Sequence, residues 1–390
     1  MISSGGIAMS ESVTLSAPLS ETGEPEKKRL RLDSVDVMKG VLILAVVLSH
    51  AWFAKGNILG DYFPYSMPAF FFLAGYVYRP GRTYVQNIGR RAVQLLIPYL
   101  FFSIYCNLLY PVYMKLVVGS QPMDLWTATL KSDAMNMLMS TPMWFLTSLF
   151  TASIVFFAVV NFVRKSWVKT CIAMVVCVGL TLVIEIVKKG AFVPWHLDYA
   201  LFGCAMMLLG ACLGYRGLFS SFHWKTLVLG LVLLLAAAVL NRLFPGSNKT
   251  SVVQYIENGK LYGVLTCFAI AVTGSVGLLC VCTLLAKIPI VRPVFAWMGR
   301  NSIWILCIHY SFIMIVELWL FNHGKLSNSL TQIVTKEIFG WGFVPPDKFR
   351  DIVIKVLVAL ASIGFSAIYA VIHNAIKRKI KASRAARAAG

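Results

Sequence analysis

The sequence predicts an all-α, polytopic membrane protein of about ten transmembrane helices with both termini in the cytoplasm. Of its 390 residues, 58% are hydrophobic and only 13% are charged, and the mean hydropathy is +0.74. Such values are typical of membrane proteins rather than of soluble domains. The formal net charge of +20 indicates a basic cytoplasmic membrane face, because the chain offers no soluble basic domain to bind nucleic acid. We therefore expect the lipid bilayer, and no nucleic acid, among its partners.

A helix needs about 20 mostly apolar residues to cross a bilayer. We identify ten candidate segments, at roughly 37–54, 63–79, 92–118, 142–163, 168–187, 197–215, 226–243, 263–286, 302–321 and 351–374. The second is short and lies between Pro64 and Pro80. The predicted domains are a disordered cytoplasmic tail over 1–30, a transmembrane domain over 31–376 and a basic cytoplasmic tail over 377–390.

The distribution of basic residues predicts the orientation, because cytoplasmic loops of membrane proteins carry an excess of lysine and arginine. With the N terminus inside, most of the 36 lysines and arginines lie on the inner side. We expect a multi-pass protein of the plasma (inner) membrane. One predicted outer loop, 322–350, departs from the bias, and its basic residues can pair with nearby acids. These are Lys325, Lys336, Lys348 and Arg350, facing Glu337, Asp347 and Asp351.

The nine cysteines all fall in apolar stretches. None forms a CxxC pair or stands with histidine at a spacing typical of metal ligands. We interpret them as small buried hydrophobic residues. The sequence therefore predicts neither a disulfide framework nor a metal site.

The stretch DVMKGVLILAVVLSH, residues 36–50, carries three polar side chains in the first predicted span. Lys39 and His50 are eleven residues apart, so a helix returns to within about 20° of the same face, about 16 Å deeper. Asp36 lies one turn before Lys39. This stripe predicts contact with an elongated anionic ligand, and a neutral imidazole is a suitable general base near pH 7. The alternatives are that Lys39 extends to the membrane surface and that His50 hydrogen-bonds a neighbouring helix.

Two further stretches offer ligand contacts. GRRAVQLLIPY places Arg90 and Arg91 at the inner end of the third span. Guanidinium groups bind phosphate in a bidentate manner, although the excess of positive charge on the inner side also explains such a pair. TPMWFLTSLF opens the fourth span with Trp144, which is either a residue of the interfacial aromatic belt or a surface on which a sugar ring stacks.

MGRNSIWILCIHY introduces the ninth span. Arg300 lies at its inner end, and Asn301 or Ser302 can cap the helix. His309 lies two turns further in, about 11 Å above Ser302. It is either a packing histidine with satisfied hydrogen bonds or a member of a site.

Two acids and a further histidine lie toward the predicted outer side. Glu185 and Glu317 can orient a histidine or bind an acceptor hydroxyl, or they can be interfacial acids without a role. In PWHLDYALFG, Trp195, His196 and Asp198 cluster at the start of the sixth span. We interpret His196 as a solvated loop histidine.

Together these stretches resemble the acyltransferase 3 family of membrane acyltransferases, and within it the fucose 4-O-acetylase-like branch. The resemblance runs from about Arg31 to His309. It rests on R-L-D-S-V-D-V-M-K-G with V-V-L-S-H, M-P-A-F-F-F-L-A-G-Y, R-R with L-L-I-P-Y, W-F-L-T-S-L-F, P-W-H-L-D-Y-A-L-F-G and G-R-N-S-I-W-I-L-C-I-H, in this order.

The resemblance implies about ten membrane helices. It also implies transfer of an acetyl or similar acyl group from cytoplasmic acyl-CoA to a hydroxyl of an envelope polysaccharide or lipid-linked glycan. By this resemblance His50 is the catalytic base. The residues implied around the donor are Lys39, Arg90, Arg91, Arg300 and Asn301. For acceptor binding or orientation we consider Asp36, Trp144, Glu185, His309 and Glu317.

The sequence thus predicts an integral membrane O-acyltransferase, in particular an O-acetyltransferase of the cell envelope. Its co-substrate would be acetyl-CoA or another acyl-CoA, with no metal. The alternative is a transporter or flippase of a small solute or lipid-linked sugar, which would use the same polar residues as a substrate path. We favour the enzyme because the sequence has no clear internal repeat and because its arginines gather on the predicted inner side.

Overall fold

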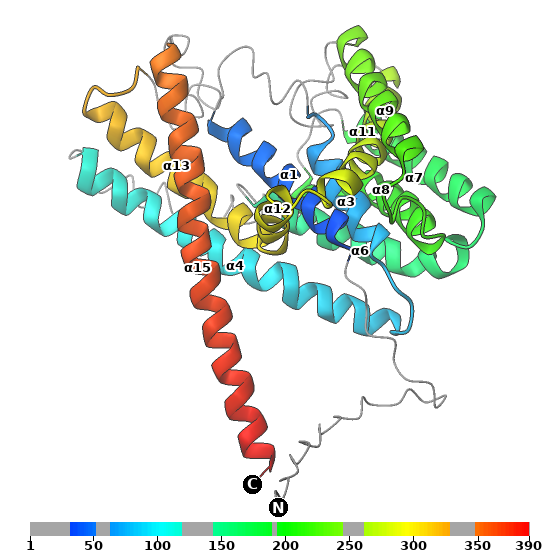
Figure 1. Cartoon of the computed structure of the whole chain (residues 1–390), viewed down its shortest axis with the longest axis horizontal. Coiled ribbons are helices and arrows are strands. Elements are labelled where there is room, and N and C mark those ends of the chain that lie inside the picture. The colour runs from blue at the N-terminus through cyan, green and yellow to red at the C-terminus, as the bar shows by residue number, and fades with distance from the viewer. Residues whose placement is uncertain are drawn as a thin grey trace, which may run out of the picture. The chain divides into compact units, whose positions relative to one another are not determined.

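The computed structural model describes residues 32–51, 63–118, 143–188, 193–244, 261–327 and 348–389, and all regular elements in these ranges are helices (Figure 1). The all-α prediction is therefore confirmed for the described residues. The helices are α1 (Asp33–Ala51), α3 (Ser66–Tyr76), α4 (Tyr84–Val118), α6 (Trp144–Val163), α7 (Trp167–Lys188), α8 (Leu197–Tyr215), α9 (Trp224–Leu243), α11 (Leu261–Leu285), α12 (Val291–Arg300), α13 (Ser302–Asn322) and α15 (Phe349–Ala389), with the short 3-10 helix η1 (Pro194–His196) before α8.

Seven of the described helices are long and apolar enough to cross a membrane. They are α6, α7, α8 with η1, α9, α11, α13 and the stretch Phe349–Ile380 of α15. The other three predicted spans coincide with α1, α3 and α4, so the number of about ten crossings stays a prediction, as does the orientation of the termini. α3 has 11 residues and is therefore only about 16 Å long, which is short of the bilayer core.

Two segments at the chain ends bear on the predicted domains. The predicted N-terminal tail, 1–30, lies outside the described residues. At the other end, α15 continues without a break from the predicted transmembrane domain into the predicted basic tail and ends at Ala389. Residues 377–389 are therefore helical.

α12 is an additional helix that the division into spans did not anticipate. It has ten residues, too few to cross a bilayer, and it buries Ala296, Met298 and Gly299 while Arg292 and Val294 are exposed. Its buried side packs against α1 (Figure 1). A short amphipathic helix of this kind has no long apolar run, so a search for membrane spans passes over it.

α1 lies at the centre of the packing, in contact with α3, α11, α12, α13 and α15. A buried apolar cluster joins α1 to α12, α13 and α15, formed by Ile43, Val46, Val47, Met298, Ile305, Ile313, Val358 and Ala359. Two glycines bring α1 and α12 unusually close. A Cβ at Gly40 would overlap the backbone of Phe295, and one at Gly299 would overlap the carbonyl of Asp36. The contact thus fixes the N-terminal half of α1 against α12.

α3 is held in the same backbone-to-backbone manner against α8. A Cβ at Gly75 would overlap the backbone of Met207, and a Cβ at Gly210 or Gly214 would overlap a backbone carbonyl of α3. The short α3 is thereby buried along most of its length. Its first turn, which contains Met67, is placed beside the end of α1.

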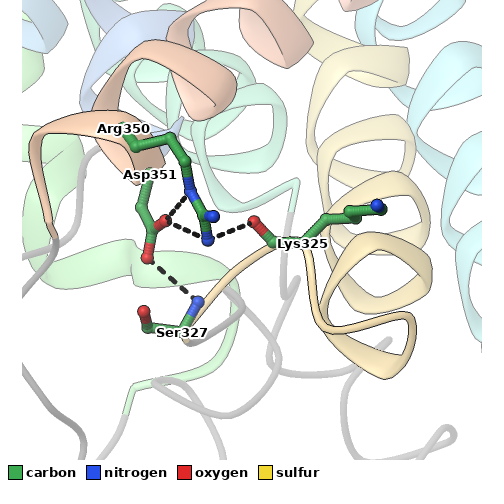
Figure 2. A network of polar contacts seen from close by, with 4 residues as sticks. All are labelled: Lys325, Ser327, Arg350 and Asp351. Atoms are coloured by element: carbon green, nitrogen blue, oxygen red, sulfur yellow. Dashed lines mark hydrogen bonds and ion pairs between the residues drawn. The ribbon is translucent and has the colours of Figure 1, made fainter.

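A polar network fixes the start of α15 to the segment that follows α13 (Figure 2). Asp351 is fully buried and accepts a hydrogen bond from the Ser327 backbone N–H at 2.9 Å. Arg350 forms an ion pair with Asp351 at 3.4 Å and donates to the Lys325 carbonyl at 3.1 Å. The predicted pairing is confirmed for Arg350 and Asp351, whereas Lys325 contributes its backbone oxygen. The other acids of this prediction, Glu337 and Asp347, and also Lys336, lie outside the described residues.

Candidate functional site

Two histidines from helices far apart in the sequence lie side by side. His50 belongs to the last turn of α1, and His309 lies two turns into α13. Their ring centroids are 5.3 Å apart with an interplanar angle of 40°. The ring of Tyr310 meets that of His50 edge-on, also at 5.3 Å. The structure therefore brings together two residues that the sequence singled out independently.

The histidines line a cavity of about 30 Å³. Its walls come from α1, α3, α6 and α13 and comprise Val46, His50, Met67, Met143, Trp144, Phe145, Leu306, His309 and Tyr310. A cavity of this kind needs about 10–15 Å³ to hold one water molecule, so this one is large enough for a small polar group. The cavity thus has room for a hydroxyl group, which would meet two imidazoles in otherwise mostly apolar surroundings. A neutral imidazole in such a place can accept the proton of a hydroxyl.

The hydrogen bonding of His309 defines the direction in which its ring can act. Nδ1 lies 2.8 Å from the carbonyl oxygen of Ile305, one turn earlier in α13. Because a carbonyl only accepts hydrogen bonds, Nδ1 must carry the proton, and in the neutral ring Nε2 is then an acceptor. The residue is 2% exposed, and Nε2 is buried without a hydrogen-bond partner among the described residues.

An aromatic group adjoins the cavity through Trp144. Its ring lies 5.4 Å from His196 and 5.5 Å from Tyr199, and these two rings are 5.9 Å apart. The ring centroids of Trp195 and Tyr99 are 6.3 Å apart. His196 is half-buried among these rings, and not the solvated loop histidine that we expected.

The backbone that presents His196 is strained. Trp195 and His196 both have positive φ angles, of 55° and 48°. A non-glycine residue in this region costs on the order of 1–3 kcal/mol and persists only where the surrounding structure enforces it. The ring contacts of Trp195 and His196 are the packing that holds this turn before α8.

The polar residues at the other end of α1 are gathered by α12. Gly299 packs on the carbonyl of Asp36, and a Cβ there would lie 3.0 Å from the Cβ of Lys39. Arg300 and Asn301 directly follow Gly299 in the chain. The contact at Gly299 therefore places the end of α12 against the first turns of α1. Here Arg292 pairs with Asp33 at 3.6 Å.

The cap predicted at the start of α13 is not formed by a side chain. Asn301 occupies the N-cap position but makes no side-chain hydrogen bond to the first turn of α13. Its amide instead donates to the carbonyl of Trp297 at 2.9 Å, because the side chain is buried and turned back onto α12. Asn301 therefore closes α12 and does not cap α13.

The remaining predicted residues are not among those that line the cavity. Asp36 is buried fourteen residues before His50, about 21 Å along α1. Arg90 is exposed and Arg91 half-buried on α4, and neither makes a hydrogen bond or ion pair with a described residue. Glu185 and Glu317 are buried in α7 and α13, and neither lines the cavity.

Reading the sequence missed several residues of the cavity wall. Tyr310 directly follows His309, so the I-H-Y end of the stretch was the available signal. The quoted stretches around Pro68 and Trp144 also contain three wall residues, Met67, Met143 and Phe145, but their residue types offered no reason to assign them a role in a site. Apolar wall residues carry no chemical signature, so only the three-dimensional arrangement identifies them.

Comparison with known proteins agrees with this arrangement. A family model described as an acyltransferase domain, that of the acyltransferase 3 family, matches residues 32–375. The match includes every residue that lines the cavity. No curated protein and no solved structure matches the chain. With seven helices able to span a membrane and a family match over most of its length, the chain belongs to the acyltransferase 3 family of membrane acyltransferases.

Proposed function

We propose that this protein is an O-acyltransferase in which His50 is the general base, with acyl-CoA as donor and a carbohydrate or lipid-linked glycan as acceptor. The observation that carries the proposal is the cavity between α1 and α13. It has room for a hydroxyl group and has two imidazoles in its wall. Membership of the family supports acyl transfer as the reaction. The cavity supports the site at which the acceptor hydroxyl would lose its proton.

In the proposed reaction His50 takes the proton of the acceptor hydroxyl. The hydroxyl oxygen forms a bond to the thioester carbonyl carbon, and the carbon–sulfur bond then breaks. His50 returns the proton to the departing CoA thiolate, so that the products are an O-acyl ester and free CoA. A positioned base typically contributes about 10²–10⁴-fold to the rate.

The donor would extend along α1 from the end that packs on α12. Lys39 lies eleven residues before His50, a rise of about 16 Å along the helix. We assign the donor phosphates to the Lys39 end, where the contact at Gly299 also brings Arg300 and Asn301 to α1. Arg90 and Arg91 complete the proposed phosphate contacts, because guanidinium groups pair well with phosphate.

The acceptor would rest on the aromatic group beside the cavity. Trp144 has its ring in contact with His196 and Tyr199 and also lines the cavity. A sugar ring that stacked on Trp144 would extend one hydroxyl toward His50. The sequence resemblance to the fucose 4-O-acetylase-like branch favours a sugar, in particular a deoxyhexose, and an acetyl group as the acyl donor.

Purified full-length protein in lipid nanodiscs tests the proposal with radiolabelled acetyl-CoA and a panel of methyl pyranosides that includes methyl fucopyranosides. Thiol release and label in the sugar are measured together. We expect His50→Ala to lower ester formation by about 10²–10⁴-fold and to leave acetyl-CoA binding intact. The control is His223→Ala, because His223 is an exposed histidine near Ser221, at 3.3 Å. Wild-type rates in His50→Ala would overturn the role of His50. Movement of a sugar across the membrane of reconstituted vesicles without thiol release would instead indicate the alternative function, a transporter.

A further inference from the structure

We infer that His309 is a positioning residue for His50. Its Nε2 accepts a hydrogen bond from a ring N–H of His50 and thereby fixes which nitrogen of His50 faces the acceptor hydroxyl. The inference rests on the proposed function, because it assigns His50 the part of the base. It adds a second residue whose contribution lies in the orientation and charge stabilisation of that base.

The first step of the argument is the fixed tautomer of His309. The Ile305 carbonyl, 2.8 Å from Nδ1, holds the proton on that nitrogen. Nε2 of the neutral ring consequently has a lone pair and no proton. A base whose ring is oriented by a further hydrogen-bonded group is the recurrent arrangement in enzymes that activate hydroxyl groups.

The second step is the position of Nε2. It is buried, and no described residue donates a hydrogen bond to it in this structure. A buried acceptor left without a donor is unfavourable, so a donor is expected when the site is in its working arrangement. The His50 ring is at 5.3 Å between centroids, and two imidazoles at this separation reach hydrogen-bond distance when their nitrogens face each other.

The third step is the effect on the reaction. With one His50 nitrogen donating to His309, the other nitrogen is left as the acceptor for the hydroxyl. When His50 gains the proton, its N–H toward His309 becomes a charged donor, and such hydrogen bonds are shorter and stronger. His309 thus stabilises the protonated base and takes no proton itself. The proton still passes from the hydroxyl to His50 and then to the CoA thiolate.

The sharpest test compares two amides at position 309. His309→Asn keeps a donor near the place of Nδ1, and so the bond to Ile305, but has nothing at the place of Nε2. His309→Gln keeps an acceptor oxygen near Nε2. We expect His309→Asn to lower kcat by about 10–100-fold with an unchanged KM for acetyl-CoA, and His309→Gln to stay closer to wild type. If the residue were only structural, asparagine would be the better replacement.

A second histidine, directly after the end of α13, provides the control. His323 makes the same kind of bond, from Nδ1 to the Trp319 carbonyl four residues earlier at 2.8 Å, but it is exposed. His323→Asn and His323→Gln are expected to leave kcat unchanged. The assay uses acetyl-CoA with a methyl fucopyranoside, or with a total glycolipid extract of the producing cells if the glycoside is not acylated.

An NMR measurement tests the inference without turnover. In full-length protein labelled with 15N-histidine, His50 is expected to show one tautomer in the wild type and a mixture of tautomers in His309→Asn. A mixture already in the wild type would overturn the inference, as would an asparagine variant that is as active as the glutamine variant. Both results leave the proposed function standing if His50→Ala is inactive, whereas an active His50→Ala removes the proposed function itself.

Discussion

Replacing Gly299 by alanine tests how closely α12 must lie against α1. The added Cβ would overlap the Asp36 carbonyl and lie 3.0 Å from the Cβ of Lys39. Forcing extra atoms into a packed interior typically costs about 1–3 kcal/mol. We expect a loss near the upper value, about 3 kcal/mol, because the overlapped atom belongs to the backbone of a helix and cannot rotate away as a side chain can. Acetyl-CoA binding should weaken as well, because the displacement separates Lys39 from Arg300.

The control for this experiment is Gly179→Ala on α7. An added Cβ there meets nothing within 4 Å, and alanine inside a helix is more favourable than glycine by about 0.5–1 kcal/mol. A thiol-reactive dye can follow thermal unfolding in detergent, because it reports the exposure of buried cysteines such as Cys204 and Cys280. Gly299→Ala should lower Tm and Gly179→Ala should keep or raise it. Equal Tm values for the two variants would refute the close contact of α1 and α12.

Three further variants test other parts of the molecule. Arg216→Ala should lower Tm strongly, because the guanidinium donates to the carbonyls of Arg164 at 3.2 Å and Lys165 at 2.9 Å and stacks 4.3 Å from the centre of the Trp167 ring; an unchanged Tm would contradict this role. Asp351→Ala should destabilise the protein by about 1–3 kcal/mol in the same assay, because it removes the acceptor of a backbone N–H, and a loss below about 0.5 kcal/mol would count against the network. Combined replacement of both α4 arginines, 90 and 91, by alanine should raise the Kd for acetyl-CoA without changing Tm, and an unchanged Kd would remove them from the donor site.

The helices were largely predictable because a membrane span can be recognised in the sequence by its length and apolar composition. All ten predicted segments coincide with helices, although only seven of these helices meet the length and composition of a span. α12 could not be found in this way, because a search for about 20 apolar residues in a row does not detect a helix of ten amphipathic residues. Asn301, one of the two residues expected at the cap of α13, does occupy the N-cap position, but its side chain makes no cap hydrogen bond, because a local pattern does not reveal that the amide is buried against α12.

The candidate site was predictable in its parts and not in its assembly. An ionisable residue inside a span is conspicuous, so His50 and His309 could each be singled out. Their contact depends on α1 and α13 being neighbours, and helical periodicity within one segment carries no information about which other segment it faces. For the same reason nothing in the sequence separated His309, which lines the cavity, from Glu317, which is buried two turns further along the same helix.

The size of the cavity has a consequence for the fidelity of the proposed reaction. A space that admits one hydroxyl group also admits one water molecule, and water is itself a hydroxyl compound that His50 could activate. Shape alone therefore does not protect the thioester from hydrolysis. Protection of the thioester must come from the acceptor, whose stacking on Trp144 would close the cavity and displace the water. The ratio of free CoA to ester formed then measures how completely an acceptor does so, and it ranks candidate sugars even when their rates are similar.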